Sequence, residues 1–319
     1  MQMKIIITGS AGFIGYHLIK KLLLLDHVIY GIDNYSNYYD VELKLLRKKS
    51  LEHENYFFFK QDINSISLDN EEFDLAINLA AQAGVRVGKN QEYLYQKTNV
   101  EGFKSFCEYC CNNGISKIIY ASSSSVYSDA GNGKFSENLT QLSPKSLYGK
   151  SKLKNEEYAS ELIEKDLISS IIGLRFFSVY GPYGRPDMAY FLFADALLKG
   201  TPILLNNHGT MFRDMTYIDD IVDGIVRSIN FISKNTQNKT NEIFNLGNDT
   251  PIETIHLLRS LEQKLNKKAS ITHQLTNNES LYTHADISKA KKILGYRPKT
   301  NLEEGIQKFI DWYIKYENI

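Results

Sequence analysis

The sequence predicts an α/β fold in which a doubly wound parallel sheet is followed by a smaller C-terminal α/β domain. Two observations predict it. Short apolar runs rich in Ile, Val and Phe alternate with amphipathic segments, as buried parallel strands alternate with helices. The first of these runs, residues 3–8, leads directly into a glycine-rich turn. The 319 residues, 43% of them hydrophobic, are enough for one large domain or two modest ones.

The N-terminal segment matches a dinucleotide-binding fingerprint. Gly9, Gly12 and Gly15 follow the first strand, and a helix is expected at 16–25. Glycines let the backbone approach a pyrophosphate, whose charge meets the helix N-terminus. The second strand, 28–32, ends at Asp33, which can accept hydrogen bonds from a ribose diol and would repel a 2′-phosphate. The segment therefore indicates a Rossmann-type domain that binds NAD rather than NADP, with a purely structural turn as the alternative.

The rest of the first half continues this alternation. Strands are expected at 56–61, 73–79 and 117–121, and a long helix at 92–114. The fourth strand is followed by small residues, among them Ala80 and Ala81. Small side chains there would let a ligand lie close to the backbone, at the sheet edge where open α/β sheets bind ligands.

The second half supplies one more strand of the sheet and then a smaller domain. After a strand at 169–174 the chain is expected to leave the sheet near Tyr180. Helices are expected at 191–198, 219–232, 251–265 and 303–313, and strands at 203–206 and 269–274. We therefore predict a dinucleotide-binding domain at 1–179 and a substrate domain at 180–319, with a segment near 214–248 returning to the first domain.

Composition limits the partners and the compartment. Lys plus Arg and Asp plus Glu both total 37, so no net charge would attract nucleic acid or an anionic membrane. The N-terminal apolar run is too short for an export signal or a membrane span. Cys107, Cys110 and Cys111 have no neighbouring cluster of Cys or His. They indicate reduced thiols in a cytoplasmic protein rather than disulfides or a metal site.

A candidate catalytic set follows the fifth strand. Ser122, Ser123, Ser124 and Ser125 directly follow that strand. Tyr148 and Lys152 lie four residues apart at the start of a helical pattern, on one face. The ammonium group would favour phenolate and lower a tyrosine pKa that is otherwise about 10, and a serine hydroxyl would share the substrate's proton. The alternative is an ordinary exposed pair beside a capping loop.

Together these motifs resemble the extended short-chain dehydrogenase/reductase superfamily. The resemblance rests on residues 8–15 and 78–86, on the serine run and on Tyr148 to Lys152. Later stretches at 174–189, 213–220 and 245–248 are similar to the UDP-glucuronate 4-epimerase branch, which is close to the UDP-glucose 4-epimerases. The matches extend from the N-terminus to Trp312.

The resemblance implies a reaction and a set of roles. In such isomerases a tyrosine takes the proton of the sugar 4-hydroxyl while hydride passes from C4 to NAD, and hydride then returns to the other face of the 4-keto sugar. Tyr148 would be this base, Lys152 would hold the nicotinamide ribose and lower the tyrosine pKa, and Ser123 would bind the 4-oxygen. The implied cofactor contacts are Gly9, Gly12, Phe13, Ile14, Gly15, Asp33, Asn34, Asp62, Ile63, Ala80, Ala81, Asn99, Tyr148 and Lys152.

Substrate contacts are also implied. Related dehydratases and decarboxylases carry carboxylates where this chain has Ser124 and Ser125, so elimination and decarboxylation are disfavoured. Those serines and Ser178 would hold a uronate carboxylate, and Arg185 and Arg213 would bind a diphosphate. The predicted substrate-binding residues are Arg86, Ser124, Ser125, Ser178, Arg185 and Arg213. Residues 276–280 depart from the family's Pro-Gly-Asp-Val segment, which leaves the shape of the uridine pocket open.

The leading hypothesis is 4-epimerisation of UDP-glucuronate to UDP-galacturonate with bound NAD. The alternatives are a UDP-glucose or UDP-N-acetylhexosamine 4-epimerase and, from another class, a catalytically silent NAD-sensing or scaffold protein. We expect a cytoplasmic homodimer that serves cell-surface polysaccharide biosynthesis, because the helices beginning near Glu92 and Tyr148 pair between subunits in this superfamily.

Overall fold

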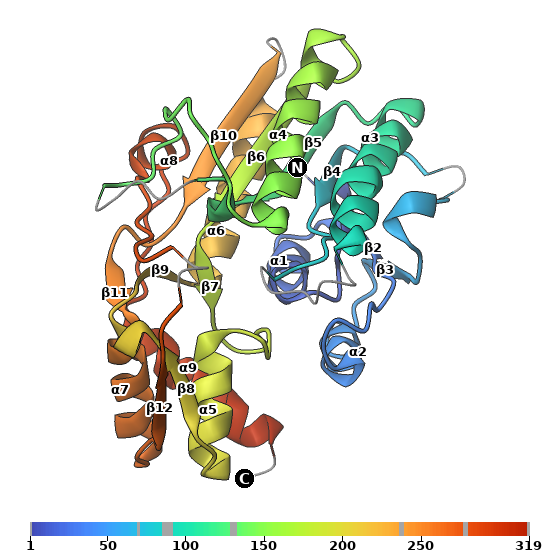
Figure 1. The fold of residues 1–319 in the computed structure, drawn as a ribbon. Coiled ribbons are helices and arrows are strands. Elements are labelled where there is room, and N and C mark those ends of the chain that lie inside the picture. The colour runs from blue at the N-terminus through green and yellow to red at the C-terminus, as the bar shows by residue number, and fades with distance from the viewer. Residues whose placement is uncertain are drawn as a thin grey trace.

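A parallel sheet organises the larger part of the molecule (Figure 1). The computed structural model describes residues 2–68, 71–84, 92–127, 133–235, 239–276 and 280–317. Seven of the described strands form this sheet in the spatial order β10-β6-β5-β4-β1-β2-β3, and all neighbours are parallel. The strands are β1 (Lys4–Thr8), β2 (Val28–Ile32), β3 (Tyr56–Phe59), β4 (Leu75–Asn78), β5 (Lys117–Ser123), β6 (Ser170–Phe176) and β10 (Thr240–Leu246).

Both faces of the sheet are covered by helices. Ile5 and Ile7 of β1 belong to a core shared with helices α1 (Phe13–Leu23) and α6 (Ile218–Lys234). Ile6, which points to the other face, belongs to a core shared with α3 (Gly102–Asn112) and α4 (Leu147–Glu164). This double burial explains why the strands are continuous apolar runs rather than alternating ones. A further helix, α2 (Val41–Lys49), follows β2. The predicted α/β fold with a doubly wound parallel sheet is therefore confirmed.

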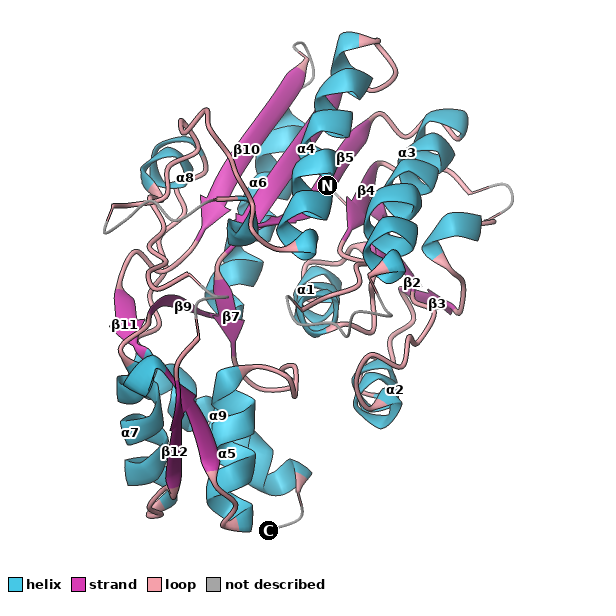
Figure 2. Cartoon of the chain, viewed as in Figure 1, coloured by secondary structure: helices cyan, strands magenta, loops and turns pink. Residues whose placement is uncertain are grey.

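A smaller region lies beside the carboxyl ends of the sheet strands (Figure 2). It contains a three-stranded sheet, β11-β9-β7, and a parallel pair, β12-β8. Its elements are β7 (Ser178–Tyr180), α5 (Ala189–Lys199), β8 (Ile203–Asn206), β9 (Phe212–Tyr217), β11 (Pro251–Glu253), α7 (Thr254–Leu265), β12 (Ile271–Gln274) and α9 (Leu302–Tyr316). Helix α8 (Ser288–Ile293) lies beside β10 of the main sheet instead (Figure 1). The division of the chain at 179–180 stays a prediction, since β10 and α6 pack with the main sheet.

Three local expectations need correction. The edge strand β10 was not predicted, because its polar residues interrupt the apolar pattern. Residues Pro251–Glu253 form a strand rather than the first turn of a helix, since they pair with β9. The long helix expected at 92–114 begins as a π-helical segment, Tyr95–Glu101, before α3 continues it.

A buried ion pair fixes the end of β5. Arg175 of β6 donates to both oxygens of Glu156 in α4, at 2.9 and 2.7 Å. Ser122 at the end of β5 donates to the same carboxylate at 2.5 Å, and Arg175 also donates to the Tyr127 hydroxyl at 2.8 Å. These contacts tie β5, β6 and α4 together directly beneath the serine run.

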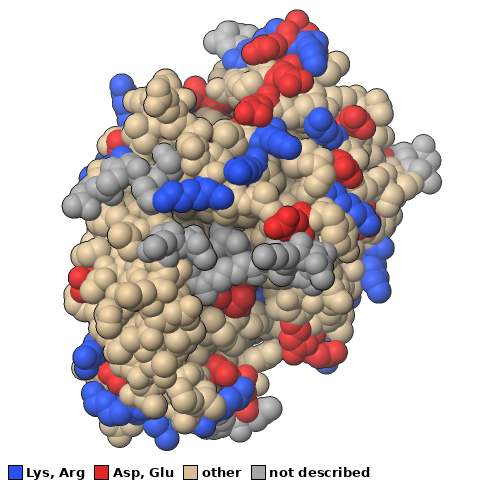
Figure 3. Space-filling model, in the orientation of Figure 1, with Lys and Arg blue, Asp and Glu red and all other residues tan. Residues whose placement is uncertain are grey.

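The surface is mixed in charge. On the face shown in Figure 3, Lys and Arg side chains intermingle with Asp and Glu. Cys107 and Cys110 are buried free thiols, and Cys111 is half-buried. Within the described ranges we find no cluster of Cys, His, Asp and Glu that would hold a metal, and no helix with the length and apolar character needed to span a membrane.

Candidate active site

A cavity of about 700 Å³ lies at the carboxyl ends of the sheet strands. The main sheet and its connections contribute one wall, which includes Gly9, Ser123 and Tyr148. The smaller region contributes the opposite wall, which includes Ser178 and Arg213. Such a crevice, outside the carboxyl ends of parallel strands, is where open α/β sheets bind ligands.

The glycine turn leaves no room for side chains. Gly9 has a φ of +71°, and a Cβ there would come within 2.7 Å of the Ala80 nitrogen. A Cβ at Gly15 would lie 2.2 Å from the Gly9 carbonyl oxygen. No side chain caps the N-terminus of α1, and Gly12, Phe13 and Ile14 line the cavity there. The turn thus forms a cradle that accepts a pyrophosphate against the helix N-terminus.

Asp33 is buried in the cavity wall beside this turn. Its carboxylate accepts hydrogen bonds from the Ala11 nitrogen at 3.1 Å and from the Tyr35 nitrogen at 2.8 Å. The neighbouring Asn34 donates to Asp62 at 2.9 Å. Asn34 and Ile63 line the cavity, whereas Asp62 lies behind them and caps the short turn that contains Ile63.

Small residues continue the cofactor side of the wall. Ala80 and Ala81 line the cavity after β4. Asn99, in the π-helical segment, is 1% exposed and lies behind the wall. It accepts a hydrogen bond from the Gln82 nitrogen at 2.7 Å and donates to the Ser151 hydroxyl at 2.9 Å. Asn99 therefore holds the loop after β4 against α4.

The serine run and α4 bring the candidate catalytic residues together. A Cβ at Gly149 would lie 2.2 Å from the Ser125 carbonyl oxygen, so the helix approaches the serine run as closely as a glycine permits. Ser123 and Tyr148 both line the cavity, and the Ser123 hydroxyl accepts a hydrogen bond from the Ser125 nitrogen at 3.1 Å. Lys152 is 1% exposed, and its Nζ donates to the Ala121 carbonyl at 2.8 Å and lies 5.9 Å from the centre of the Tyr148 ring.

Burial dominates the acid-base properties of this set. Burial lowers the pKa of Lys152 from 10.5 to about 8. Burial also raises the pKa of Tyr148 above 10, against the charge of Arg185 and the hydrogen bond with Ser123, which both lower it. The sequence led us to expect that Lys152 would lower this pKa. In the structure the groups with that effect are Arg185 and Ser123.

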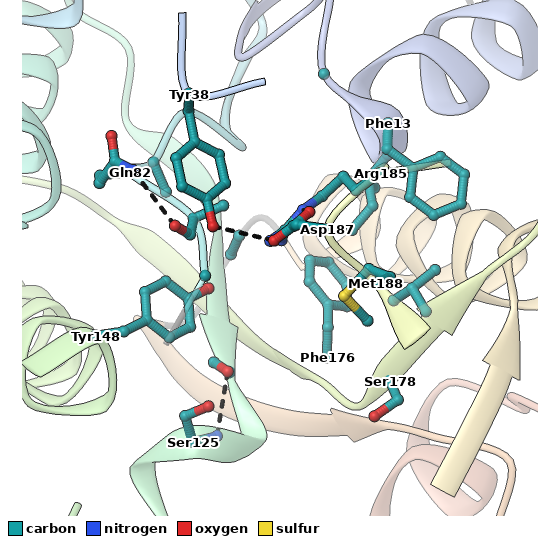
Figure 4. A pocket seen from close by; sticks show the side chains of 18 of the residues that line it. Phe13, Tyr38, Gln82, Ser125, Tyr148, Phe176, Ser178, Arg185, Asp187 and Met188 are labelled. Carbon is teal, nitrogen blue, oxygen red and sulfur yellow. Dashed lines mark hydrogen bonds and ion pairs between the residues drawn. The ribbon is translucent and has the colours of Figure 1, made fainter. Parts of the chain in front are cut away.

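The predicted substrate residues surround the same cavity, as far as the structure describes them. Ser124, Ser125, Ser178, Arg185 and Arg213 all line it, and Figure 4 shows Ser125, Ser178 and Arg185 around the space that Tyr148 faces. Arg86 lies outside the described residues. Arg213 donates to the Phe212 carbonyl at 2.8 Å. Asn207, which follows the cavity residue Asn206, exchanges two hydrogen bonds of 2.9 Å with the Thr276 backbone, and residues 277–279 lie outside the described residues.

Among the cavity residues that were not predicted, Asp187 and Tyr38 interact with Arg185 or with its ion-pair partner. Arg185 makes an ion pair with Asp187, and the Tyr38 hydroxyl donates to the same carboxylate at 3.0 Å (Figure 4). Asp187 lies two residues after Arg185, within the stretch 174–189 that is similar to the UDP-glucuronate 4-epimerase branch. Tyr38 lies in an irregular segment with no periodic pattern. Neither residue belongs to a sequence motif that would have marked it as a site residue.

Comparisons with known proteins identify the class. Residues 5–247 match the NAD dependent epimerase/dehydratase family, and the chain belongs to that family. The predicted family and the predicted cofactor, NAD, are thus confirmed.

Individual relatives narrow the comparison. The chain is 39% identical to UDP-glucuronate 4-epimerase 4 of Arabidopsis thaliana over 98% of this chain and 75% of that protein. It is 37% identical to Protein CapI of Staphylococcus aureus over 98% of this chain and 99% of that protein. The crystal structure of UDP-glucuronic acid 4-epimerase from Bacillus cereus, in complex with UDP-glucuronic acid and NAD, superposes with a TM-score of 0.89 at 32% identity, covering 98% of this chain and 100% of that one.

Proposed function

We propose that this protein is an isomerase that converts UDP-glucuronate into UDP-galacturonate by 4-epimerisation. The observation that carries the proposal is that Ser123, Tyr148 and the buried Lys152 meet at one cavity, whose other wall presents Ser178 and Arg213. The similarity to UDP-glucuronate 4-epimerases from a plant and a bacterium supports this choice of sugar.

The cradle at the glycine turn fits the cofactor. NAD, when bound, supplies an acceptor for the C4 hydride and returns that hydride to the other face of the sugar. The turn of Gly9, Gly12 and Gly15 would hold its pyrophosphate at the N-terminus of α1, because a turn this tight leaves no room for a Cβ against the surrounding backbone. Asp33 would accept hydrogen bonds from the adenosine ribose, and Lys152 would donate to the nicotinamide ribose.

Proton transfer falls to Tyr148. Its phenolate oxygen would take the proton of the sugar 4-hydroxyl, which leaves the neutral phenol, and would return that proton after the ketone has turned over. Ser123 holds the 4-oxygen during both steps. Because burial favours the neutral phenol, the positive charge of Arg185 and the neighbouring Ser123 hydroxyl, which both lower the Tyr148 pKa, would help to make the tyrosine a usable base.

The opposite wall would select a charged substrate. Ser124, Ser125 and Ser178 offer hydroxyl donors to a C6 carboxylate, and none of them supplies the acid or base that elimination requires. Arg213 would bind the diphosphate. Arg185 acts electrostatically on Tyr148 and so lies near the sugar end of the cavity, where it would meet an anionic group of the substrate.

A homodimer in the cytoplasm, serving cell-surface polysaccharide biosynthesis, belongs to the same proposal. Tyr93 and Leu147 are 63% and 41% exposed near the starts of the two helical segments that we expect to pair between subunits. Light scattering at micromolar concentration should give the mass of a dimer. A monomer under these conditions would contradict the proposed pairing.

An activity panel tests the function. The protein is incubated with NAD and, separately, with UDP-glucuronate, UDP-glucose and UDP-N-acetylglucosamine, and the sugar protons are followed by NMR. We expect UDP-glucuronate to be converted faster than the other two donors, as seen from the galacturonate signals. If UDP-glucuronate is not converted at any time, the proposal is rejected. Faster turnover of a neutral sugar would favour the other 4-epimerases, and no turnover of any donor would favour a silent NAD-binding protein.

A further inference from the structure

The loop that carries Arg185 is attached to the dinucleotide-binding half by three side chains. This arginine loop, residues 182–187, connects β7 to α5 and extends toward α1 and α2 (Figure 1). His17 of α1 bonds to the Pro182 carbonyl at 2.9 Å. Arg47 of α2 donates to the carbonyls of Tyr183 and Gly184, and Tyr38 donates to Asp187.

Arg47 makes the central attachment. Its guanidinium is fully buried, at 0% exposure, and donates five hydrogen bonds. Nε and one terminal nitrogen reach the Tyr183 carbonyl at 3.0 and 2.7 Å, and the latter nitrogen also reaches the Gly184 carbonyl at 2.9 Å. The other terminal nitrogen reaches the Ala11 carbonyl at 3.0 Å and the Tyr39 hydroxyl at 2.6 Å. Every N–H of the fork thus has a neutral acceptor, which only arginine can provide.

The arginine loop has a backbone that depends on such support. Tyr183 has a φ of +55°, in the left-handed region that side chains other than glycine rarely adopt. A Cβ at Gly184 would lie 1.6 Å from the Tyr190 hydroxyl, so the next residue is confined as well. Burial lowers the pKa of His17 to about 4, and this neutral ring donates to a carbonyl that can only accept.

Arg47 also reaches the glycine turn. Ala11, whose carbonyl accepts from Arg47, donates its own N–H to Asp33. One side chain therefore bridges the turn expected to hold the pyrophosphate and the loop that presents Arg185. Tyr38 supports the far end of that loop through Asp187, the ion-pair partner of Arg185 (Figure 4).

We infer that Arg47 is a positioning residue that sets the place of Arg185 relative to Tyr148 by fixing the arginine loop to the glycine turn. The inference rests on the proposed function, because Arg185 matters only if the cavity binds an anionic sugar nucleotide. Arg47 itself contacts neither the cavity nor, by this inference, the substrate. Its loss should therefore weaken substrate binding more than it slows the chemical step.

The test compares Arg47→Lys, which keeps the charge and loses the fork, with Lys49→Met, an exposed position on the same helix. At a temperature well below the unfolding midpoint of each protein, we expect Arg47→Lys to raise the KM for UDP-glucuronate about tenfold while kcat changes less than threefold. Lys49→Met should match the wild type. A merely structural role would lower the midpoint without moving KM.

A second variant covers the case in which Arg47→Lys fails to fold. Tyr38→Phe removes one hydroxyl from a half-buried ring and leaves the guanidinium intact. We expect a several-fold rise in KM with unchanged NAD content. An unchanged KM in a folded Arg47→Lys would overturn the inference. If Arg47→Lys does not fold, an unchanged KM in Tyr38→Phe would show that the attachments of the arginine loop do not govern substrate binding, and that result would overturn it.

Binding separates this inference from the proposed function. Calorimetry with UDP-glucuronate on Tyr148→Phe and on Tyr148→Phe/Arg47→Lys needs no turnover. We expect the second protein to bind about tenfold more weakly. If the wild type does not epimerise UDP-glucuronate, the proposed function fails; if the two calorimetric affinities are equal, the positioning role fails.

Discussion

The two walls of the cavity are built in different ways. Ser123, Tyr148 and Lys152 stand on β5 and α4. Glu156 of α4 binds both Ser122 of β5 and Arg175 of β6, so these elements are joined directly. On the other wall Ser178 and Arg213 come from short strands and Arg185 from an irregular loop held by side chains of the opposite half. The wall with Ser123, Tyr148 and Lys152, here called the catalytic wall, is held by contacts within its own half of the molecule. The wall with Ser178, Arg185 and Arg213, here called the substrate wall, is held in part by side chains of the opposite half. Changes to the first should affect turnover or stability, and changes to the second should affect substrate affinity.

The strongest test of the catalytic wall is Tyr148→Phe. Loss of the hydroxyl removes the proposed proton acceptor, and positioned acid-base groups contribute about 10²–10⁴-fold in rate. We expect kcat for UDP-glucuronate to fall by about this factor, measured by NMR of the product, with NAD content and the thermal midpoint close to those of the wild type. Retained turnover would show that another group moves the proton.

The support beneath that wall is tested by Glu156→Ala. The change leaves the buried guanidinium of Arg175 without its carboxylate and Ser122 without its acceptor. Removing one partner of a buried ion pair destabilises a protein by about 3–5 kcal/mol, and we expect a loss in that range from urea unfolding. Glu157→Ala, at the exposed neighbouring position, should change stability by less than about 0.5 kcal/mol. Equal stabilities of the two variants would mean that the catalytic wall does not depend on this pair.

Lys152→Met tests how much folding stability is lost by burying the charged ammonium group of Lys152 in the catalytic wall. Burial lowers the pKa of Lys152 from 10.5 to about 8, so keeping this lysine charged at pH 7 costs about 3 kcal/mol of folding stability. We expect the variant to lose epimerase activity and yet to unfold at higher urea concentration than the wild type, when both are stripped of NAD.

The difference in folding stability between the wild type and Lys152→Met should depend on pH. Below pH 8 the lysine is charged in the folded and unfolded states, so the full cost is present and the methionine variant has its largest advantage. As pH rises from about 8 toward 10.5 the folded protein releases the proton first, wild-type stability rises, and the advantage disappears. Lys150→Met, at an exposed position, should show no such trend. A pH-independent difference would place its origin in packing instead.

The same contrast between the walls separates what the sequence predicts from what it does not. The turn at Gly9 to Gly15 and the spacing of Tyr148 and Lys152 are local patterns on regular elements, and the structure brings all of these residues to one cavity. Tyr38 and Asp187 lie in irregular segments and Arg47 lies on helix α2, and the contacts of all three join residues far apart in the chain. The edge strand β10 was not predicted for a related reason. Its own sequence is polar, and it is a strand because it pairs with β6. The direction of the Tyr148 pKa could not be read from spacing, since it depends on burial and on Arg185, which arrives from another element.

The substrate wall is tested most gently by Ser178→Ala, with Ser178→Thr as the matched variant. Ser178 lines the cavity at the start of β7. A hydrogen bond to a charged group contributes about 1.5–3 kcal/mol, and about 1.4 kcal/mol corresponds to a tenfold change in affinity. Ser178→Ala should therefore raise the KM for UDP-glucuronate by roughly tenfold, with little change in kcat or in the thermal midpoint. Threonine keeps the hydroxyl and should restore the KM to within a few-fold of the wild type. If alanine instead lowers kcat and leaves KM unchanged, Ser178 contributes to the chemical step, and the division of labour between the two walls is wrong.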